Sequence, residues 1–540
     1  MANEPENRPP DGPGITRKEL LKRAGGGAAL LSVPSLLAAC GGGSGGGGSS
    51  SGAGGSTSSA KLKTGGHLRV GATGGSAKDV IDAHNAIADT DIVRISTLYE
   101  PLAAPTPDFK STQMVLAESI EPVNGNAALW DIRLRPGIEF TNGQTVTADD
   151  VIFSINRIIN PKSPGTGAAS IGYINTKGMK KMDSRTVRVP LQFANAGFID
   201  DLGQYFNNIV PTNYNPKSPV GTAAWKFQSF TPGQQSVFVK NPNYWQSGRP
   251  YADQLTIIDF ADDTARVNAL LANQIDIADT VPTELLPQVQ SNGNALAIDN
   301  PAGGWLPITM RVDQPPFNDV RVRQAMRLIV NRPQMVEQVL SGHGDTGNDL
   351  YGRFDPSYDT SLPQRHQDIE QAKSLLKAAG HEGLTVTLVT GDILAGVPEE
   401  SQVFAQQAKA AGVTVNLDKS TTFYGSNYLK YTFAMDFWGP RRYLSQVAQG
   451  SLPNSPFNET HWDNAQFKKL IAEARAEVNT SKRYDLIHEA QTIEYNEGGY
   501  IIAFFPNFTF GASSKLGGIP PGLQSTFLMG PALKDIGFKA

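Results

Sequence analysis

The residues able to do redox, metal or nucleophilic chemistry are few in this chain. Its single cysteine, Cys40, excludes an intrachain disulfide, a CxxC redox pair and a thiolate zinc cluster. The seven histidines show no HxH or HxxxH spacing, and the string HEAQT that begins at His488 lacks the second imidazole of a zinc protease. We therefore expect no cofactor, no metal and no enzymatic activity. A Ser-His-Asp constellation forms only on folding, so a secreted hydrolase stays open as a minor alternative.

The net charge of the chain limits the classes of partner that it can be expected to bind. The 540 residues carry 47 basic and 51 acidic side chains, a net charge of -4. A nucleic-acid-binding protein needs a concentrated basic face to neutralise phosphates, so we expect no nucleic-acid partner. A chain of this length has ample core and predicts two to four domains.

The only cysteine lies at the end of a targeting segment. Residues 1–39 combine a basic cluster around Arg17 with a weakly apolar run from Ala24, the layout of a secretory signal. The string LAAC that ends at Cys40 resembles a bacterial lipobox, in which the cysteine thiol carries the lipid. We expect removal of residues 1–39 and lipidation of Cys40. Arg17-Lys18 also resembles a twin-arginine signal with one arginine replaced, so the export route stays open.

A flexible tether follows. Residues 41–60 contain only Gly, Ser, Ala and Thr, which cannot bury enough apolar surface to fold. As a random coil this segment spans roughly 25 Å. We expect residues 40–60 to hold the folded part just clear of a membrane surface.

The remaining chain shows clear α/β patterning. Thr147 begins a capping box followed by apolar positions at helical spacing, and the helix is expected to stop at Asn160-Pro161. A strand at 384–390, a helix at 400–411 and a strand at 413–417 form a βαβ unit, typical of an α/β layer. The segment 500–505 also reads as a strand.

Several motifs, in order and spacing, resemble the family 5 extracytoplasmic solute-binding proteins of ABC importers. The most specific match covers 116–151, with LAES at 116–119, LRPG at 134–137 and TADDV at 147–151. Further matches are NPNYW at 241–245 and PFNDVRVRQA at 316–325. The resemblance runs from about Gly65 to the C-terminus.

The resemblance implies a two-lobed α/β fold of the periplasmic-binding-protein type, with an extra subdomain, closing over a ligand like a hinged clam. Lobe I is expected at 65–299 and 507–540, with an inserted subdomain at about 97–215, and lobe II at 300–506. A few hinge dihedrals then absorb the closing motion.

The resemblance also implies a function. We expect an extracytoplasmic lipoprotein, anchored to the outer face of the cytoplasmic membrane, that captures oligopeptides or peptide-like solutes and delivers them to an ABC permease. The protein is expected to be a monomer. Another small solute of the same family, such as an opine, an oligosaccharide or a metal chelate, remains the alternative.

The expected ligand-reading residues depart from the family's peptide binders. Those proteins hold the ligand ammonium with an acid after an aromatic-glycine element, which here resembles the segment 437–443. Arg441 and Arg442 stand where the acid is expected, and a guanidinium in a desolvated cleft recognises a carboxylate or phosphate. We therefore predict either an anionic ligand group held by Arg441 or Arg442, or two arginines on a solvated loop. Trp305, Trp438 and Tyr443 complete the candidate site, since large amphipathic rings cover ligands well.

Overall fold

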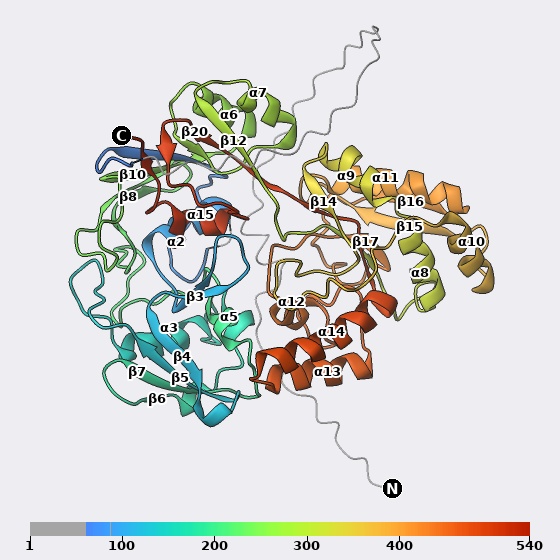
Figure 1. Ribbon diagram of the computed structural model, residues 1–540, viewed down its shortest axis with the longest axis horizontal. Coiled ribbons are helices and arrows are strands. Elements are labelled where there is room, and N and C mark those ends of the chain that lie inside the picture. The colour runs from blue at the N-terminus through green and yellow to red at the C-terminus, as the bar shows by residue number, and fades with distance from the viewer. Residues whose placement is uncertain (1–60, 87) are drawn as a thin grey trace.

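The structure is a computed structural model that describes residues 61–86 and 88–540. The expected signal segment, the lipidation candidate Cys40 and the Gly/Ser tract up to residue 60 lie outside the described residues. The described chain builds two α/β lobes that lie side by side, the first in blue to green and the second in yellow to orange (Figure 1).

The first lobe is organised around a seven-stranded mixed sheet. Its central strand buries Leu68, Val70 and Ala72 completely, because alternate side chains of a strand point to the same face of the sheet. That strand, β1, pairs in parallel with β10 and β11, and the outer pairs are antiparallel. The order is β12 (Ala295–Asn300), β20 (Phe508–Ser513), β11 (Ile277–Ala278), β1 (His67–Thr73), β10 (Gln254–Phe260), β9 (Gln235–Lys240) and β8 (Trp225–Thr231).

Helices cover this sheet and close its core. The N-terminal and C-terminal parts of the chain meet here, because α2 packs against α15. A short pairing of β21 (Leu516–Gly517) with β22 (Gly537–Phe538) completes the C-terminal part. The helices are α2 (Asp89–Leu98), α6 (Asp263–Leu271), α7 (Leu286–Gln290) and α15 (Thr526–Ala532).

A smaller antiparallel sheet and three helices form the lower part of the first lobe in Figure 1. The helix expected from Thr147 is present as α3 (Ala148–Ile158), and it begins with the expected capping box between Thr147 and Asp150. Its buried face joins the core over this sheet. The other elements are β4 (Ala117–Pro122), β5 (Leu129–Leu134), β7 (Thr186–Pro190), β6 (Lys180–Lys181), the hairpin β2 (Ala103–Pro105) and β3 (Thr112–Met114), α4 (Ala168–Ile171) and α5 (Phe198–Leu202).

The second lobe has its own five-stranded sheet. The predicted βαβ unit is confirmed, because β15 pairs in parallel with β16 and α11 connects them. The connecting helix begins three residues earlier than expected, with Pro398 in its first turn, where a missing N–H costs nothing. The order is β16 (Thr414–Lys419), β15 (Thr385–Thr390), β17 (Phe433–Met435), β13 (Pro307–Met310) and β18 (Tyr500–Ile502).

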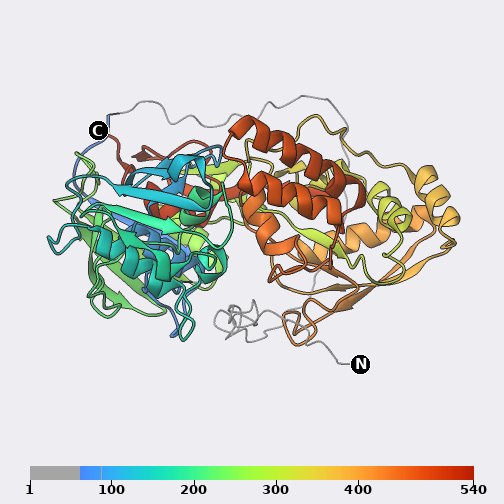
Figure 2. The same cartoon turned by 90° about the horizontal axis from the view of Figure 1, so that it is seen from below.

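The helices of this lobe pack in two groups. Seen from below, α13 and α14 lie next to each other as a long pair in orange and red, on the side of the lobe that faces the first lobe (Figure 2). The others surround the sheet. Their bounds are α8 (Val320–Leu328), α9 (Arg332–Leu340), α10 (Ile369–Ala378), α11 (Val397–Ala408), α12 (Tyr443–Gly450), α13 (Ala465–Ala476) and α14 (Thr480–Glu497).

The chain passes between the lobes twice. It leaves the first sheet after β12, enters the second at β13, and returns after β18 to form β20, which pairs with β12. The expected single strand over 500–505 is wrong in detail. β18 ends at Ile502, and β19 (Phe504–Pro506) then pairs with β14 (Gly344–Thr346) instead of the main sheet, because the chain turns out toward the first lobe.

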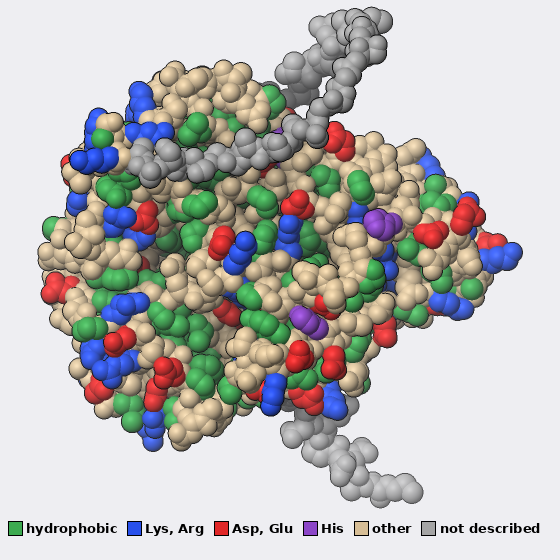
Figure 3. All heavy atoms as spheres, viewed as in Figure 1, with side chains coloured by type: hydrophobic (Ala, Val, Ile, Leu, Met, Phe, Trp, Pro, Cys, Tyr) green, Lys and Arg blue, Asp and Glu red, His purple; other side chains and the backbone are tan. Residues whose placement is uncertain are grey.

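Over most of the face shown in Figure 3, the surface offers no concentration of one charge. Lys and Arg side chains are interspersed there with Asp and Glu side chains. Within residues 61–86 and 88–540, no helix combines the length and apolar character needed to cross a bilayer.

Candidate functional site

Trp305 and Trp438, two of the predicted site residues, lie directly against each other. Each donates its backbone N–H to the other's carbonyl at 2.9 Å, which joins the approach to β13 with the end of β17. Their rings stack with centroids 6.0 Å apart and planes 12° apart. Both side chains are buried, with 2% and 5% of their surface exposed.

The stack continues through two tyrosines. Tyr351 lies parallel to Trp305 with centroids 5.3 Å apart, and Tyr443 lies parallel to Tyr351 at the same spacing. Tyr443 is fully buried, and its hydroxyl donates to Glu494 at 2.9 Å. Burial raises the pKa of the Glu494 carboxyl to about 7. The four rings form a rigid aromatic column, which is called the aromatic stack below.

The two adjacent arginines contact different elements. The guanidinium carbon of Arg441 lies 5.3 Å from the centre of the Trp438 ring, and this residue is partly exposed. Arg442 is buried and reaches across to the first lobe, where its Nε lies 3.7 Å from Asp200 and its Nη2 lies 3.5 Å from Thr112. The alternative that both arginines lie on a solvated loop is wrong for Arg442, because this side chain is buried against the first lobe.

Helix α12 carries part of the direct contact between the lobes, and α13 adds to it, because the carbonyl of Arg475 accepts the backbone N–H of Ala196 at 2.7 Å. Ser445 donates to a carboxylate oxygen of Asp201 at 2.7 Å, and Gln449 donates to the carbonyl of Ala169 at 3.3 Å. Asp201 also accepts from the hydroxyl of Tyr173 at 2.6 Å. Burial raises the pKa of the Asp201 carboxyl to about 6. The lobes therefore meet through polar groups beside the aromatic stack, an arrangement suited to reversible opening.

Sequence reasoning did not select the acids beside Trp438. Asp436 and Glu459 are buried, with 1% and 5% of their surface exposed, and the indole N–H of Trp438 donates to Glu459 at 3.3 Å. The period-two alternation does place Asp436 on the same side of the chain as Trp438. Glu459 comes from a loop far along the chain, and its position carries no signal in the sequence.

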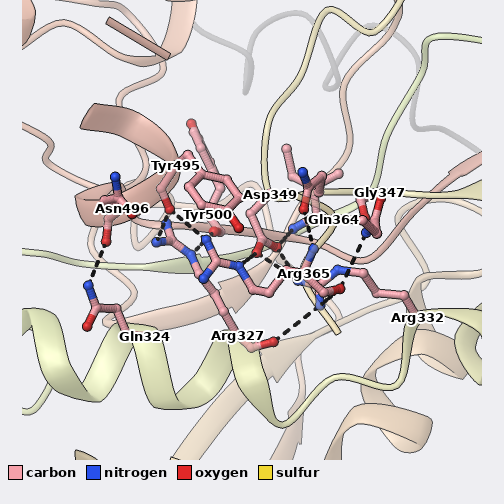
Figure 4. A network of polar contacts seen from close by, with 12 residues as sticks. Gln324, Arg327, Arg332, Gly347, Asp349, Gln364, Arg365, Tyr495, Asn496 and Tyr500 are labelled. Carbon is pink, nitrogen blue, oxygen red and sulfur yellow. Dashed lines mark hydrogen bonds and ion pairs between the residues drawn. The ribbon is translucent and has the colours of Figure 1, made fainter. Parts of the chain in front are cut away.

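A buried ionic network positions the strand that supports the stack (Figure 4). Arg332 binds both carboxylate oxygens of Asp349, at 2.8 and 2.7 Å, and Arg365 approaches the same carboxylate at 2.8 Å. Burial alone would raise the pKa of Asp349, but the facing guanidinium groups lower it below its ordinary value. Arg327 donates to the carbonyl of Tyr500 at 2.9 Å, and Asp349 accepts from the backbone N–H of the strand two residues later.

Tyr500 connects this ionic network to the aromatic stack. Its ring meets the edge of Trp305 at 5.3 Å and 83°. The network thus holds β18, and through it the inner wall of the stack, in one position.

Metal chemistry finds no support in the described chain. No group of three or more His, Cys, Asp or Glu side chains there is arranged to hold a metal ion.

Two α/β lobes joined by two connecting segments, with a stack of aromatic rings buried in the second lobe, are the architecture of a two-lobed binding protein. The sequence model for bacterial extracellular solute-binding proteins, family 5 Middle, matches residues 112–464, more than half of the chain. The chain belongs to this family of solute-binding proteins, as the motifs indicated.

Relatives with assigned ligands agree with this class. Di/tripeptide-binding protein 2 of Pseudomonas aeruginosa is 27% identical over 443 residues, which are 74% of this chain and 82% of that protein. Heme-binding protein A of Haemophilus influenzae is also 27% identical, over 431 residues, 72% of this chain and 77% of that protein.

The fold of this chain also agrees with its place in this family. The oligopeptide-binding protein AppA of Bacillus subtilis, solved in complex with a nonapeptide, superimposes with a TM-score of 0.71 at 20% identity. The superposition covers 89% of this chain and 100% of that one. The expected periplasmic-binding-protein-like fold is therefore confirmed.

Proposed function

We propose that this protein is the substrate-binding lipoprotein of an ABC importer, that it captures oligopeptides or peptide-like solutes outside the cytoplasmic membrane, and that it presents them to a permease. The observation that carries the proposal is the aromatic stack of the second lobe, whose Tyr443 lies on the same helix, α12, as the Ser445 contact with the first lobe. The rings of such a stack can cover the apolar part of a peptide. The protein's main-chain and polar groups lie next to the rings and can contact the polar part of the peptide. The similarity to a di/tripeptide-binding protein supports the choice of solute.

The proposal includes the division of the chain. Lobe I comprises 65–299 and 507–540, with an inserted subdomain at about 97–215, and lobe II comprises 300–506. The seven-stranded and five-stranded sheets support this division, since their strands fall on opposite sides of its boundaries. The protein acts as a monomer and without chemical conversion of its solute.

Each candidate residue has a proposed part in binding. Trp305 and Trp438 cover the solute, and Tyr443 acts through Tyr351 by holding the stack from behind. Arg441 and Arg442 are the candidates for a carboxylate of the solute. Arg442 supports this role, because its Nη1 is buried and makes no hydrogen bond with the part of the chain that the structure describes.

A melting screen tests the proposal. A solute that binds the folded protein raises its melting temperature by mass action. We expect di-, tri- and oligopeptide mixtures to raise it, and opines, oligosaccharides and metal chelates not to. Trp438→Ala should abolish the rise, whereas Met182→Ala, at a side chain 49% exposed on the first lobe, should leave it intact. A rise with only one of the other solute classes would replace the peptide proposal with that class.

The lipid anchor has its own test. We propose that Cys40 carries the lipid, because it ends a lipobox-like string after an apolar run. Cells grown with labelled palmitate should incorporate the label into the native protein and not into Cys40→Ser, which should leave the membrane fraction. Membrane retention of the unlabelled variant would contradict the anchor.

A further inference from the structure

The two ends of the described chain lie together at one corner of the first lobe. The backbone N–H of Lys63 donates to the carbonyl of Phe538 at 2.8 Å, and the backbone N–H of Ala540 donates to the carbonyl of Lys61 at the same distance. The C-terminal segment also pairs with an earlier one, because β22 pairs with β21. These contacts join three segments into one surface element, called the terminal ribbon below: residues 61–63, 515–517 and 537–540.

Four lysines gather on the terminal ribbon. Lys61, Lys63 and Lys515 are exposed, and Lys539 is half-buried with its ammonium group donating to the carbonyl of Ser514 at 2.8 Å. Lys515 and Lys539 are neighbours across the ribbon and share one face of it, because their backbones pair. Lys61 and Lys63 lie on the opposite face, because Leu62 between them pairs with Lys539. The ribbon therefore presents positive charge from both of its faces.

The acids close to the terminal ribbon do not neutralise these lysines. Asp535 is paired with Lys534 and with Arg249. Asp253 lies at the base of the ribbon, where a Cβ added to Gly65 would be 3.2 Å from its carboxylate. Within residues 61–86 and 88–540, none of the four ribbon lysines forms an ion pair with a carboxylate. Lys and Arg side chains are seen to gather at the same corner of the first lobe, beside the C-terminus (Figures 1 and 3).

The chain enters this ribbon from the segment that is proposed to carry the lipid. Only the Gly/Ser segment 41–60 separates Cys40 from Lys61. A random coil of this length spans roughly 25 Å. A lipid on Cys40 would therefore hold the ribbon close to the bilayer, at an effective concentration on the order of millimolar. At such a concentration even a weak attraction to the membrane keeps the ribbon in contact with it.

We propose that the terminal ribbon binds the anionic headgroups of the membrane to which the protein is anchored. This surface is additional to the solute site, and of the proposed function it uses only the anchor at Cys40. The whole chain has a net charge of -4, which alone would repel it from an anionic surface. Binding there requires a local basic cluster, and the ribbon supplies one.

The position of the ribbon is compatible with solute capture. The C-terminus lies on the side of the first lobe away from the second lobe in both views of the ribbon diagram (Figures 1 and 2). Contact of this corner with a bilayer therefore leaves the contact between the lobes free to open and close.

Vesicle sedimentation tests the membrane contact on residues 40–540 with Cys40→Ser. This chain keeps every described residue, lacks the basic targeting segment and cannot carry the lipid. We expect it to bind vesicles that contain phosphatidylglycerol and not vesicles of phosphatidylcholine alone. Binding should weaken when the ionic strength rises from about 0.15 M to about 1 M, because the Debye length falls from about 8 Å to about 3 Å.

Variants assign the binding to the ribbon. Each basic side chain near an anionic surface contributes about fivefold in binding. The variant Lys61→Gln/Lys63→Gln/Lys515→Gln should therefore bind the anionic vesicles at least about tenfold more weakly. A control variant makes the same change in net charge at three exposed lysines of the second lobe and should bind nearly as the parent does: Lys377→Gln/Lys430→Gln/Lys482→Gln. Both variants should keep the parent's melting temperature, since the six side chains are exposed.

The outcomes separate the membrane contact from the proposed function. Equal binding of the two kinds of vesicle, binding of neither, or equal losses in the two triple variants would overturn the lipid-binding ribbon. Each of these results leaves solute capture to the melting screen and the anchor to palmitate labelling. Binding to anionic vesicles that is lost only with the ribbon lysines supports the membrane contact, even where no peptide binds and no label is incorporated.

Discussion

At the residue scale, Glu494 is a carboxyl group in an environment that disfavours its charge. It accepts from Tyr443 at 2.9 Å and from Ser451 at 3.2 Å, both neutral hydroxyls, and it is 3% exposed. Burial raises its pKa from the ordinary value of 4.5 to about 7. The protonated form is therefore the one that the fold prefers, and ionising it costs stability.

This preference makes stability depend on pH with a definite sign. The unfolded chain loses the proton near pH 4.5 and the folded chain near pH 7, so the contribution of Glu494 falls as pH rises between these values. Glu494→Gln keeps the shape and does not titrate. We expect the unfolding free energy of this variant to rise relative to that of the native protein by up to about 1.4 kcal/mol per pH unit between pH 4.5 and pH 7. Above that range the difference between the two proteins should stay constant.

Chemical unfolding at pH 5, 6, 7 and 8 measures this difference. Glu489→Gln on the same helix, at an exposed position, is the matched control and should show no such trend. A difference that is independent of pH would mean that Glu494 ionises normally and that the base of the aromatic stack is more open to water than its burial indicates.

At the element scale, helix α12 links the proposed binding site to the contact between the lobes. Tyr443 in its first turn supports the aromatic stack, and Ser445 one half-turn later donates across the lobe contact to Asp201. One rigid helix therefore connects ligand cover with the contact between lobes. A change at the contact should alter ligand affinity although it touches no ligand.

Ser445→Ala tests this link. Loss of one hydrogen bond to a buried carboxylate is worth about 1 to 3 kcal/mol. Since the bond forms only when the lobes meet, we expect affinity for the best solute to fall about fivefold or more, and the radius of gyration of the unliganded protein in solution scattering to rise. Ser481→Ala, at an exposed position of α14, should change neither the affinity nor the radius of gyration. Unchanged affinity and scattering would assign Ser445 to local packing alone.

The elements were largely predictable, and the contacts between them were not. Local signals, a capping box at Thr147 and an apolar run on each side of a helix, were enough for α3 and for the β15–α11–β16 unit. The prediction of a single strand over 500–505 was wrong because β19 pairs with β14, which lies far away in the sequence. The sequence could nominate Trp305, Trp438 and Tyr443 as large amphipathic rings, but not Tyr351, which joins Trp305 to Tyr443 in one stack.

The same limit applies to charge. From the sequence, the two neighbouring arginines could hold an anionic group or lie on a solvated loop, yet Arg442 meets Asp200 because the fold brings an element of the first lobe to it. Asp436 and Glu459 are 23 positions apart and share a tyrosine hydroxyl only in three dimensions. Periodicity reports which face a side chain occupies, and it does not report what that face meets.

At the scale of the whole molecule, the two lobes are joined by two neighbouring segments (Figure 1) and touch at several points, among them α12 and Arg475 of α13. Two adjacent connections allow a hinge, because few dihedrals need to change. Separating a polar contact in water costs little free energy. The same contact still favours the closed state when a solute binds beside it. These features support the proposal that the two lobes close on a solute.

The central claim is that one peptide-like solute binds at the aromatic stack between the lobes. Calorimetric titration of the native protein with the peptide that raises its melting temperature most tests this claim directly. We predict a saturable heat with a single site per chain, a negative heat-capacity change from burial of aromatic surface, and loss of the heat in Trp438→Ala. Saturable peptide binding that is unchanged in Trp438→Ala, or no peptide binding at all, would contradict the account.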